Sequence, residues 1–280
     1  MKLSDKGGVT VSFYGVRGST PCHSSSMSRY GGNTSCVVVQ RPGQDPFVLD
    51  GGTGLRFYGL DMGADKFSGT ILLSHLHWDH VQGLPFFPQA LHEESKAQVF
   101  GPPEEDMSFA DAISNFVRPP YFPVTLSHLP GDIELADMWE ESVTIGDATV
   151  TARSVPHQGR TNGYRIEWPD FSLAYIPDHQ EPEDSSTIAP GVLDLANDVD
   201  LLIHDAQFSP ELLAARSDWG HCTPDYAAHV ADSAGASMLA LFHHDPLHDD
   251  DAVDSMLERV VGSHTSCDVV AAAEGQKLSF

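Results

Sequence analysis

Three imidazoles and one carboxylate lie within six residues of this chain, directly after the apolar run 71–73. Divalent cations such as zinc prefer neutral imidazole nitrogen and carboxylate oxygen, and a site forms only where several such groups converge. In extended backbone the first two histidines point to the same side, and a turn then directs the other two groups to a neighbouring position. The alternative is a solvated polar loop, but histidines beside a buried strand need polar partners. The segment therefore predicts a metal site with room for two cations, and its candidate ligands are His75, His77, Asp79 and His80.

Three later segments, 149–157, 172–179 and 237–246, place a histidine or an aspartate after a run of strand character. The first motif, His-x-His-x-Asp-His, resembles the signature of the metallo-β-lactamase superfamily, and the resemblance extends along most of the chain. The metal ligands that it implies are His75, His77 and His157 for the first metal, and Asp79, His80 and His243 for the second, with Asp178 bridging the two.

Two of the implied ligands have a neighbour of similar chemistry. His244 follows His243, and His179 follows Asp178. The residue types alone leave the choice between His243 and His244 open, and only the family pattern favours His243. We expect both neighbours to face the substrate or to support the ligands from behind.

Glycine-rich turns at 15–21, 29–35 and 49–54 resemble those of the branch that contains ribonuclease Z and the cyclic-phosphate phosphodiesterases. The resemblance implies that Asp50 supports the metal-binding loop. A buried carboxylate that accepts a hydrogen bond from a ligand imidazole fixes the tautomer and the orientation of that ring. We therefore expect Asp50 to contact the ligands without being one of them.

Segments 200–207 and 220–224 resemble two further motifs of that branch. The resemblance implies that His204 lies beside the scissile phosphate and protonates the leaving oxygen. His221 either supports the site or only anchors the start of the helix that Thr223 caps. The residues that depart from the usual motifs are Asp205 in place of glutamate, Gln207 in place of threonine and Cys222 in place of serine.

Strand-like runs first alternate with turns and later with helices, among them a helix from Thr223 to before Gly235 and another over about 250–262. Two sheets packed face to face with helices outside satisfy this order. The resemblance implies the same α/β (α+β) architecture, a four-layer αββα sandwich. No linker divides the chain, so we expect one domain over 1–280. The segment 102–142, rich in proline, glutamate and aromatic residues, is expected to cover the metal site.

The formal net charge of −25 bears on the partners of this chain. Such a field repels polyanions, so a long nucleic acid is an unfavourable substrate.

Four widely spaced cysteines predict free thiols in a reducing compartment. No run reaches the length of a membrane span, and segment 1–9 lacks the apolar core of a signal peptide, so the cytoplasm is the default location. The family resemblance adds a homodimer as an expectation.

The implied metal pair predicts a dinuclear phosphodiesterase for a small substrate such as a cyclic nucleotide or a cyclic phosphate. Two cations make a bridging hydroxide available near neutral pH and neutralise charge on a phosphoryl oxygen, while Asp79 orients or deprotonates the water. Three alternatives remain: an esterase or lactonase on the same scaffold, a ribonuclease for transfer RNA precursors, and a metal-bound ligand sensor without turnover. Zinc is the expected metal, and manganese and iron accept the same ligands.

Overall fold

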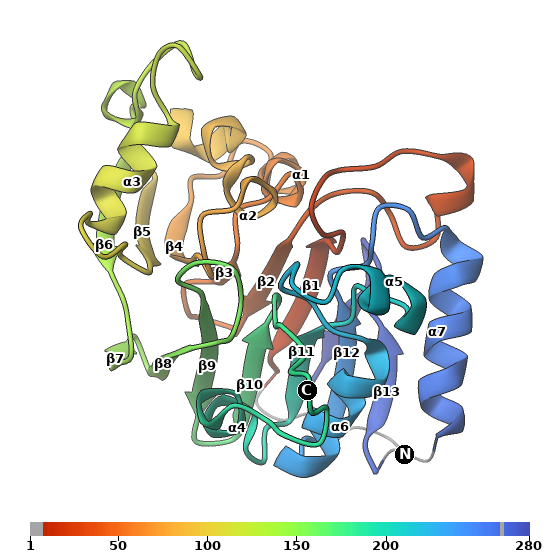
Figure 1. The fold of residues 1–280 in the computed structure, drawn as a ribbon. Coiled ribbons are helices and arrows are strands. Elements are labelled where there is room, and N and C mark those ends of the chain that lie inside the picture. Colours follow the sequence, from red (N-terminus) through yellow and green to blue (C-terminus); the bar gives the residue numbers. More distant parts are fainter. Residues whose placement is uncertain (1–7, 264–265) are drawn as a thin grey trace.

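Two seven-stranded β-sheets face each other in the computed structural model, which describes residues 8–263 and 266–280 (Figure 1). In spatial order the first sheet consists of β14 (Lys277–Ser279), β1 (Thr10–Gly15), β2 (Cys36–Gln40), β3 (Phe47–Leu49), β4 (Ser68–Leu72), β5 (Lys96–Gly101) and β6 (Asp132–Asp137). The second consists of β13 (Asp268–Ala271), β12 (Met238–Phe242), β11 (Leu201–Asp205), β10 (Phe171–Ile176), β9 (Asn162–Trp168), β8 (Ala148–Ser154) and β7 (Ser142–Ile145).

Helices cover the outer faces of both sheets. The α-helices are α1 (Gly54–Met62), α2 (Trp78–Val81), α3 (Phe109–Phe116), α4 (Pro190–Ala196), α5 (Pro210–Ala215), α6 (Pro224–Ala234) and α7 (Asp250–Gly262), and the short 3₁₀ turns are η1 (Ser25–Met27), η2 (Leu84–Phe86), η3 (Pro88–Leu91) and η4 (Leu126–His128). Helices α1 and α3 contact the first sheet, and α4, α6 and α7 contact the second. The αββα sandwich expected from the sequence is confirmed.

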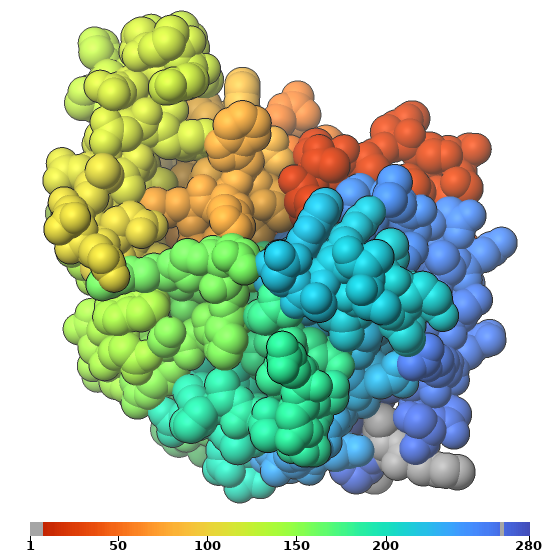
Figure 2. Space-filling view, in the orientation of Figure 1, coloured from red at the N-terminus to blue at the C-terminus, as the bar shows by residue number. Residues whose placement is uncertain are grey.

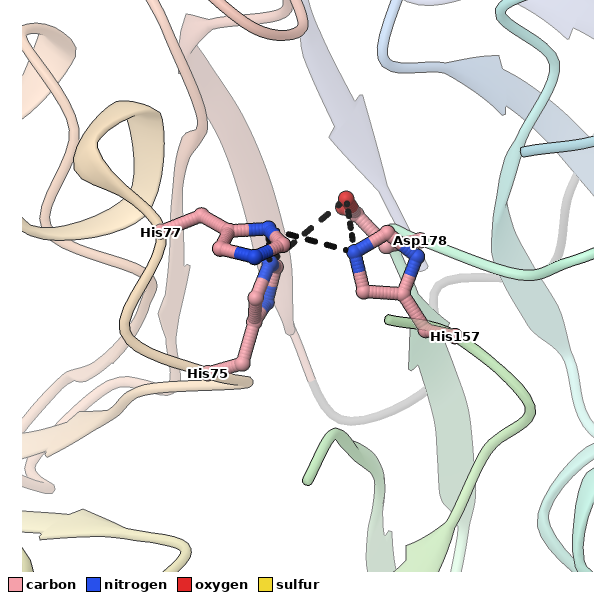
Figure 3. Close-up of side chains that lie close together, drawn as sticks. All are labelled: His75, His77, His157 and Asp178. Atoms are coloured by element: carbon pink, nitrogen blue, oxygen red, sulfur yellow. Dashed lines mark hydrogen bonds and ion pairs between the residues drawn. The ribbon is translucent and has the colours of Figure 1, made fainter. Parts of the chain in front are cut away.

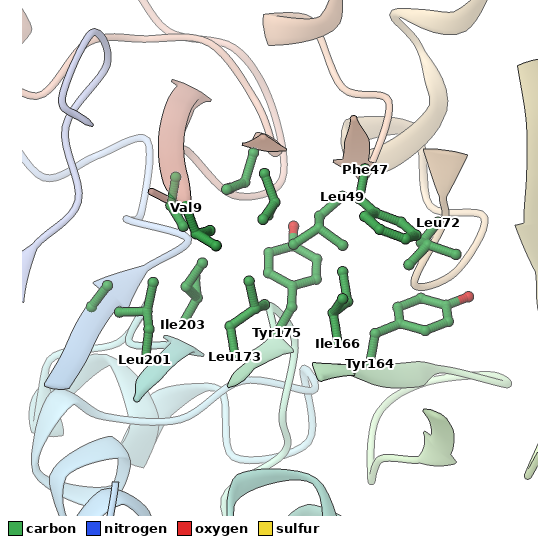
Figure 4. Packing of buried hydrophobic residues seen from close by; sticks show 14 of the residues in the cluster. Val9, Phe47, Leu49, Leu72, Tyr164, Ile166, Leu173, Tyr175, Leu201 and Ile203 are labelled. Carbon is green, nitrogen blue, oxygen red and sulfur yellow. The ribbon is translucent and has the colours of Figure 1, made fainter. Parts of the chain in front are cut away.

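Apolar side chains from the inner faces of the two sheets form the central core (Figure 4). Phe47 and Leu49 of the first sheet lie opposite Ile166 and Tyr175 of the second, and all four are buried. Strands β10, β11 and β12 are buried at every position because helices cover their other face. Their uninterrupted apolar runs in the sequence have this cause.

The predicted helix after Thr223 forms as expected. The hydroxyl of Thr223 accepts a hydrogen bond from the backbone N–H of Tyr226, Pro224 occupies the first turn, and Gly235 ends the helix with φ 74°. Helix α7 begins in the same way, because the carboxylate of Asp249 accepts a hydrogen bond from the N–H of Ala252. The acidic run at this point is therefore a capped helix start.

The strand directions bring the functional loops to one edge of the sandwich. Strands β3, β4 and β5 are parallel, as are β10, β11 and β12, so the carboxyl ends of each set open at the same edge. Strand β8 has the same direction as β10, since both are antiparallel to β9. The loops after β4, β8, β10 and β12 carry the implied metal ligands. Such an edge is where α/β folds bind their ligands.

The segment 102–142 forms α3, η4 and β6 at one corner of the molecule, where it projects beyond the sandwich (Figures 1 and 2). Its role as a cover of the metal site stays a prediction. Cys22, Cys36 and Cys222 are free thiols. Within the described ranges no helix is both long and apolar enough to cross a bilayer. The expectation about a signal peptide depends largely on residues 1–7, which lie outside the described residues.

Candidate metal centre

The loop after β4 is held in place by one buried carboxylate. Asp50 accepts hydrogen bonds from the backbone N–H of Ser74 at 2.7 Å and from the Ser74 hydroxyl at 2.9 Å. The chain then runs extended through His77 and enters the single turn of α2. That turn places Asp79 and His80 beside the two histidines that precede it, as the spacing of the motif predicts.

Three imidazole nitrogens from two loops face a common point (Figure 3). Nε2 of His75 lies 2.8 Å from Nδ1 of His77, which lies 3.2 Å from Nε2 of His157. Asp178 adds its Oδ2 atom, 3.4 Å from His157 Nε2 and 3.7 Å from His75 Nε2. We call His75, His77 and His157 the outer half of the centre.

A second set of groups lies directly behind the first. Nε2 of His243 is 3.1 Å from Asp79 Oδ2 and 3.2 Å from Nε2 of His80. Asp178 Oδ1 lies 3.1 Å from His80 Nε2 and 3.3 Å from His243 Nε2. We call Asp79, His80 and His243 the inner half. The two oxygens of Asp178 are thus divided between the two halves.

The hydrogen bonds on the far side of each ring determine whether the nitrogen that faces the centre has a lone pair for a cation. Nδ1 of His80 lies 2.7 Å from Asp50 Oδ2, and Nδ1 of His157 lies 2.6 Å from the carbonyl oxygen of Gly220. Both partners only accept hydrogen bonds, so in each neutral ring Nδ1 carries the proton and Nε2 presents a lone pair to the centre. The donor set of imidazole nitrogen and carboxylate oxygen therefore fits divalent metal ions.

Burial keeps the outer half neutral. Loss of solvation lowers the pKa of His75, His77 and His157 below that of an ordinary imidazole. Burial alone would raise the pKa of Asp178, but the neighbouring imidazoles, first His243 and then His80, hold it well below the usual range. The outer half and Asp178 thus offer neutral nitrogens and an ionised oxygen, the forms that bind metal.

His80 differs from the outer rings. Burial alone would lower its pKa, but the carboxylates of Asp79, Asp178 and Asp50 outweigh that effect and raise it well above the ordinary value. These carboxylates favour a second proton on the ring in the absence of a cation. A cation that binds here displaces that proton, so metal binding releases protons to solution.

His221 stands beside the centre and belongs to a buried pair with Asp205. Its Nδ1 atom lies 2.9 Å from Asp205 Oδ2 and 3.8 Å from Asp178 Oδ2. Burial would lower the pKa of His221, but the carboxylate of Asp205 raises it to about 9. His221 therefore does more than anchor a helix, and the departure of Asp205 from glutamate preserves a carboxylate partner.

His204 lies elsewhere. It is fully buried, its Nδ1 donates to the carbonyl oxygen of Asp205 at 2.8 Å, and its Nε2 lies 3.0 Å from Nδ1 of His179. Both ring nitrogens thus have partners within the protein. His204 and His179 form a buried pair, and neither lines the cavity over the metal centre.

His244 is also turned away from the centre. Its Nε2 donates to the carbonyl oxygen of Ala272 at 2.9 Å, and its ring packs edge-on against Tyr30. The expectation that His244 faces the substrate or supports a ligand therefore finds no contact in the described structure. Of the two adjacent histidines, His243 is the one that directs Nε2 toward the centre, in agreement with the family pattern.

A cavity of about 390 Å³ opens over the centre. Segments near residues 80, 157 and 220 meet on this face of the molecule (orange, green and cyan in Figure 2). Trp78 is 75% exposed at the cavity wall, although it lies between two implied ligands in the sequence. The lining residues are Ser19, Leu76, His77, Trp78, Asp79, Asp178 and His221.

Two contributors were not identified as site residues from the sequence. Ser19 donates its backbone N–H to Asp79 Oδ2 at 2.6 Å, and the hydroxyl of Tyr175 donates to Asp50 Oδ2 at 2.8 Å. Ser19 lies in one of the glycine-rich turns, which was the only signal for it. Tyr175 lies in a buried strand and is indistinguishable there from a core residue.

Comparisons with known proteins agree with this geometry. The family model of the beta-lactamase superfamily domain matches residues 68–244, which contain every implied ligand. The ribonuclease Z of Halorubrum lacusprofundi is 26% identical in an alignment that covers 84% of this chain and 86% of that protein. The uncharacterized protein Rv1339 of Mycobacterium tuberculosis is 29% identical, with 85% of this chain and 81% of that protein covered.

Solved structures share the fold. The metallo-beta-lactamase fold protein YhfI from Bacillus subtilis has a TM-score of 0.74 at 20% identity and covers 98% of this chain and 100% of its own. A diphosphatase from the PhnP family has a TM-score of 0.69 at 19% identity and covers 97% of this chain and 98% of its own. With the sandwich, the ligand set and the match over most of its length, the chain belongs to the metallo-β-lactamase superfamily as a hydrolase of the ribonuclease Z-like branch.

Proposed function

We propose that this protein is a dinuclear-metal phosphodiesterase that hydrolyses a small phosphodiester, either a cyclic nucleotide or a cyclic phosphate. The observation that carries the proposal is the division of the two Asp178 oxygens between the halves of the centre, beside an open cavity and the buried pair of His221 and Asp205. The relatives named ribonuclease Z and diphosphatase support chemistry at phosphorus.

The residues of each half would hold one divalent cation, zinc in the first instance, with manganese and iron as the other metals that accept these ligands. Bound there, two cations lower the pKa of a water molecule and neutralise charge on a phosphoryl oxygen. Asp79 has one oxygen within the inner half and lines the cavity, so its carboxylate is positioned to orient an attacking water or to take up its proton.

We assign the proton for the leaving oxygen to His221 in place of His204. His221 lines the cavity and carries its proton because Asp205 faces Nδ1. Asp205 holds the ring in position and favours the imidazolium, as a buried carboxylate does for other general acids. His204 is enclosed and has no access to the cavity.

The size of the cavity and the charge of the protein favour a small substrate. A volume of about 390 Å³ suits a mononucleotide-sized ligand, and the formal net charge of −25 opposes the approach of a long polyanion. The exposed indole of Trp78 offers a flat apolar surface at the rim, on which a nucleobase stacks favourably. A cytoplasmic location and a homodimer stay predictions.

Ribonuclease activity is the second candidate, because the relative from Halorubrum lacusprofundi carries that name over most of both chains. An RNA substrate would make activity fall steeply with rising salt, since the protein would release counterions from many phosphates. An esterase or lactonase on the same scaffold is the third.

A substrate panel separates these candidates. The metal-loaded protein is assayed with bis(p-nitrophenyl) phosphate, cyclic mononucleotides and cyclic dinucleotides, and in parallel with p-nitrophenyl acetate, a lactone and a transfer RNA precursor. The proposal expects turnover of a small phosphodiester that disappears in Asp178→Ala and persists in Asp65→Ala, a control at an exposed position far along the chain. Faster turnover of the ester, the lactone or the RNA, or full activity of Asp178→Ala, would overturn it.

A further inference from the structure

Within the described residues, Nδ1 of His243 lacks the hydrogen-bond partner that Nδ1 has in the rings of His75 and His80. Nδ1 of His75 lies 3.0 Å from the Ser74 hydroxyl, and Nδ1 of His80 lies 2.7 Å from Asp50. Nδ1 of His243 is buried and finds no hydrogen-bond partner within the described residues. A neutral ring that binds a cation through Nε2 carries its proton on Nδ1, and that proton needs an acceptor.

The side-chain oxygen of Gln207 is the matching group. Oε1 of Gln207 is also buried without a partner in the described part of the chain. Both atoms lie 2.4 Å from the position that a Cβ atom on Gly18 would occupy. They therefore flank the same small space, which stays open only because residue 18 has no side chain.

The contacts of the amide nitrogen show which way the Gln207 group faces. Nε2 of Gln207 lies 3.2 Å from the hydroxyl of Ser19 and 3.5 Å from Asp245 Oδ2. A carboxylate accepts hydrogen bonds and does not donate them, so the nitrogen belongs on the Asp245 side. The oxygen is then left on the side of His243.

The other contact of the Gln207 amide leads to the second ligand of the same half. Ser19 donates its backbone N–H to Asp79 Oδ2 at 2.6 Å. Ser19 has φ 61°, a left-handed conformation that is unfavourable for a residue other than glycine and that persists only where neighbours hold it. The hydrogen bond from Gln207 to the Ser19 hydroxyl is one such restraint.

We propose that Gln207 is a positioning residue of the inner half. Oε1 of Gln207 and Nδ1 of His243 are not hydrogen-bonded to each other in the described structure. When metal binds, the Gln207 oxygen accepts the Nδ1 proton of His243, directly or through one water in the space beside Gly18, and the Gln207 nitrogen holds Ser19 where the backbone of that residue fixes Asp79. One amide thus orients two of the three inner ligands, and Asp50 orients the third, His80. The inference rests on the two-metal centre of the proposed function.

Metal binding tests the role of Gln207 without any substrate. The metal content and the dissociation constants of both zinc ions are measured by elemental analysis and by chelator competition for the wild type and three variants. In Gln207→Met the amide is lost at similar volume, and in Gln207→Asn the amide is withdrawn by one methylene. Gln207→Glu keeps an oxygen toward His243. Gln98→Met, at an exposed position of β5, is the matched control.

Loss of a partner behind a metal ligand costs about 10–100-fold in affinity. We expect this loss for the second zinc ion in Gln207→Met and Gln207→Asn, with the first ion bound as in the wild type. Gln207→Glu keeps an acceptor for His243 but loses the donor to Ser19 and faces Asp245, so its affinity for the second ion should lie between those of Gln207→Met and the wild type. Gln98→Met should match the wild type. In ¹⁵N-labelled zinc protein, the Nδ1 proton of His243 should move upfield in Gln207→Met.

Two results contradict the inference in distinguishable ways. Wild-type binding of both ions by Gln207→Met and Gln207→Asn would overturn the role of Gln207 and leave the metal centre standing. Fewer than two zinc ions in the wild type would overturn the centre itself, and the inference with it. If Gln207→Met does not fold, as judged by circular dichroism, Gln207→Asn decides the outcome.

Discussion

The two halves of the metal centre differ in their access to solvent. In the outer half His77 is exposed, while the side chains of His75 and His157 are enclosed. Asp79, His80 and His243 of the inner half are all buried. Their supports differ as well. His157 is held by a backbone carbonyl, while His80 is held by the carboxylate of Asp50.

Because of this difference, we expect the two halves to have different roles. The outer half reaches the cavity through His77, which is exposed, and the inner half reaches it only through the buried carboxylate of Asp79. The inner half depends on side chains that come from distant segments and that are packed in the core, such as Asp50 and Tyr175. We therefore expect damage to the outer half to affect substrate and exchange first, and damage to the inner half to affect metal retention and folding.

The substitution with the largest expected effect is the one that should damage both halves at once. Asp178→Ala deletes the carboxylate that both halves share, so both metals lose an anionic ligand. We expect hydrolysis of bis(p-nitrophenyl) phosphate to fall by about 10³-fold or more, which corresponds to the several kcal/mol of charge stabilisation that metals supply. Elemental analysis should find less than one metal per chain. Retention of two metals would show that the halves are independent of Asp178.

Substitution of His221 tests the side of the centre that faces the cavity. Removal of a general acid costs about 10²–10⁴-fold, so His221→Gln should lower kcat by that amount with a poor leaving group. The loss should shrink with p-nitrophenolate, a good leaving group that needs no proton. His204→Gln serves as the comparison and should lower kcat less than tenfold. The reverse order of the two variants would restore His204 to the role that the family pattern implies.

Substitution of Asp50 tests the buried support of the inner half. Asp50→Asn keeps the shape but removes the carboxylate that holds Nδ1 of His80. Affinity for the metal of the inner half should fall by about 10–100-fold. Affinity for the other metal should fall less, because asparagine keeps one oxygen for the Ser74 N–H that holds the loop. Chelator competition measures both constants. An equal loss of affinity for both metals would mean that Asp50 does not support the inner half selectively.

The smallest predicted effect concerns stability and the neighbour of an inner ligand. Burial lowers the pKa of His244 to about 3, below that of the unfolded chain, so acid favours unfolding. The contribution of this ring is fully present above pH of about 6.5 and is lost as the pH falls toward 3. Urea unfolding of the metal-free protein should show a fall between pH 7 and pH 5 that is smaller by about 2 kcal/mol in His244→Gln. An equal fall in both proteins would exclude His244 as a source of acid sensitivity.

The sequence anticipates the fold and the clustering of the candidate ligands for a common reason. Ligands such as His75 and His157 follow strand-like runs, and the resemblance to the superfamily supplies the register that distinguishes His243 from His244. Asp50 was anticipated as a support, and it contacts His80. These features depend on local order along the chain, which a sequence displays directly.

Other features depend on directions that the sequence does not display. Neighbouring side chains of a strand point to opposite faces, and in β11 Asp205 reaches the site while His204 points into the layer beneath it. The roles of Ser19 and Gln207 follow from a left-handed backbone turn and a missing Cβ atom at Gly18. Such contacts arise only when segments distant in the chain are packed together.

The metal content of the purified protein tests the central claim most directly. The wild type is loaded with zinc, freed of excess ion by dialysis, and measured by elemental analysis while a chelator is added in steps. The account predicts two zinc ions per chain that leave in two separate steps, with activity recovered only when both return. A single step with one ion per chain, or undiminished hydrolysis after complete metal removal, would contradict it.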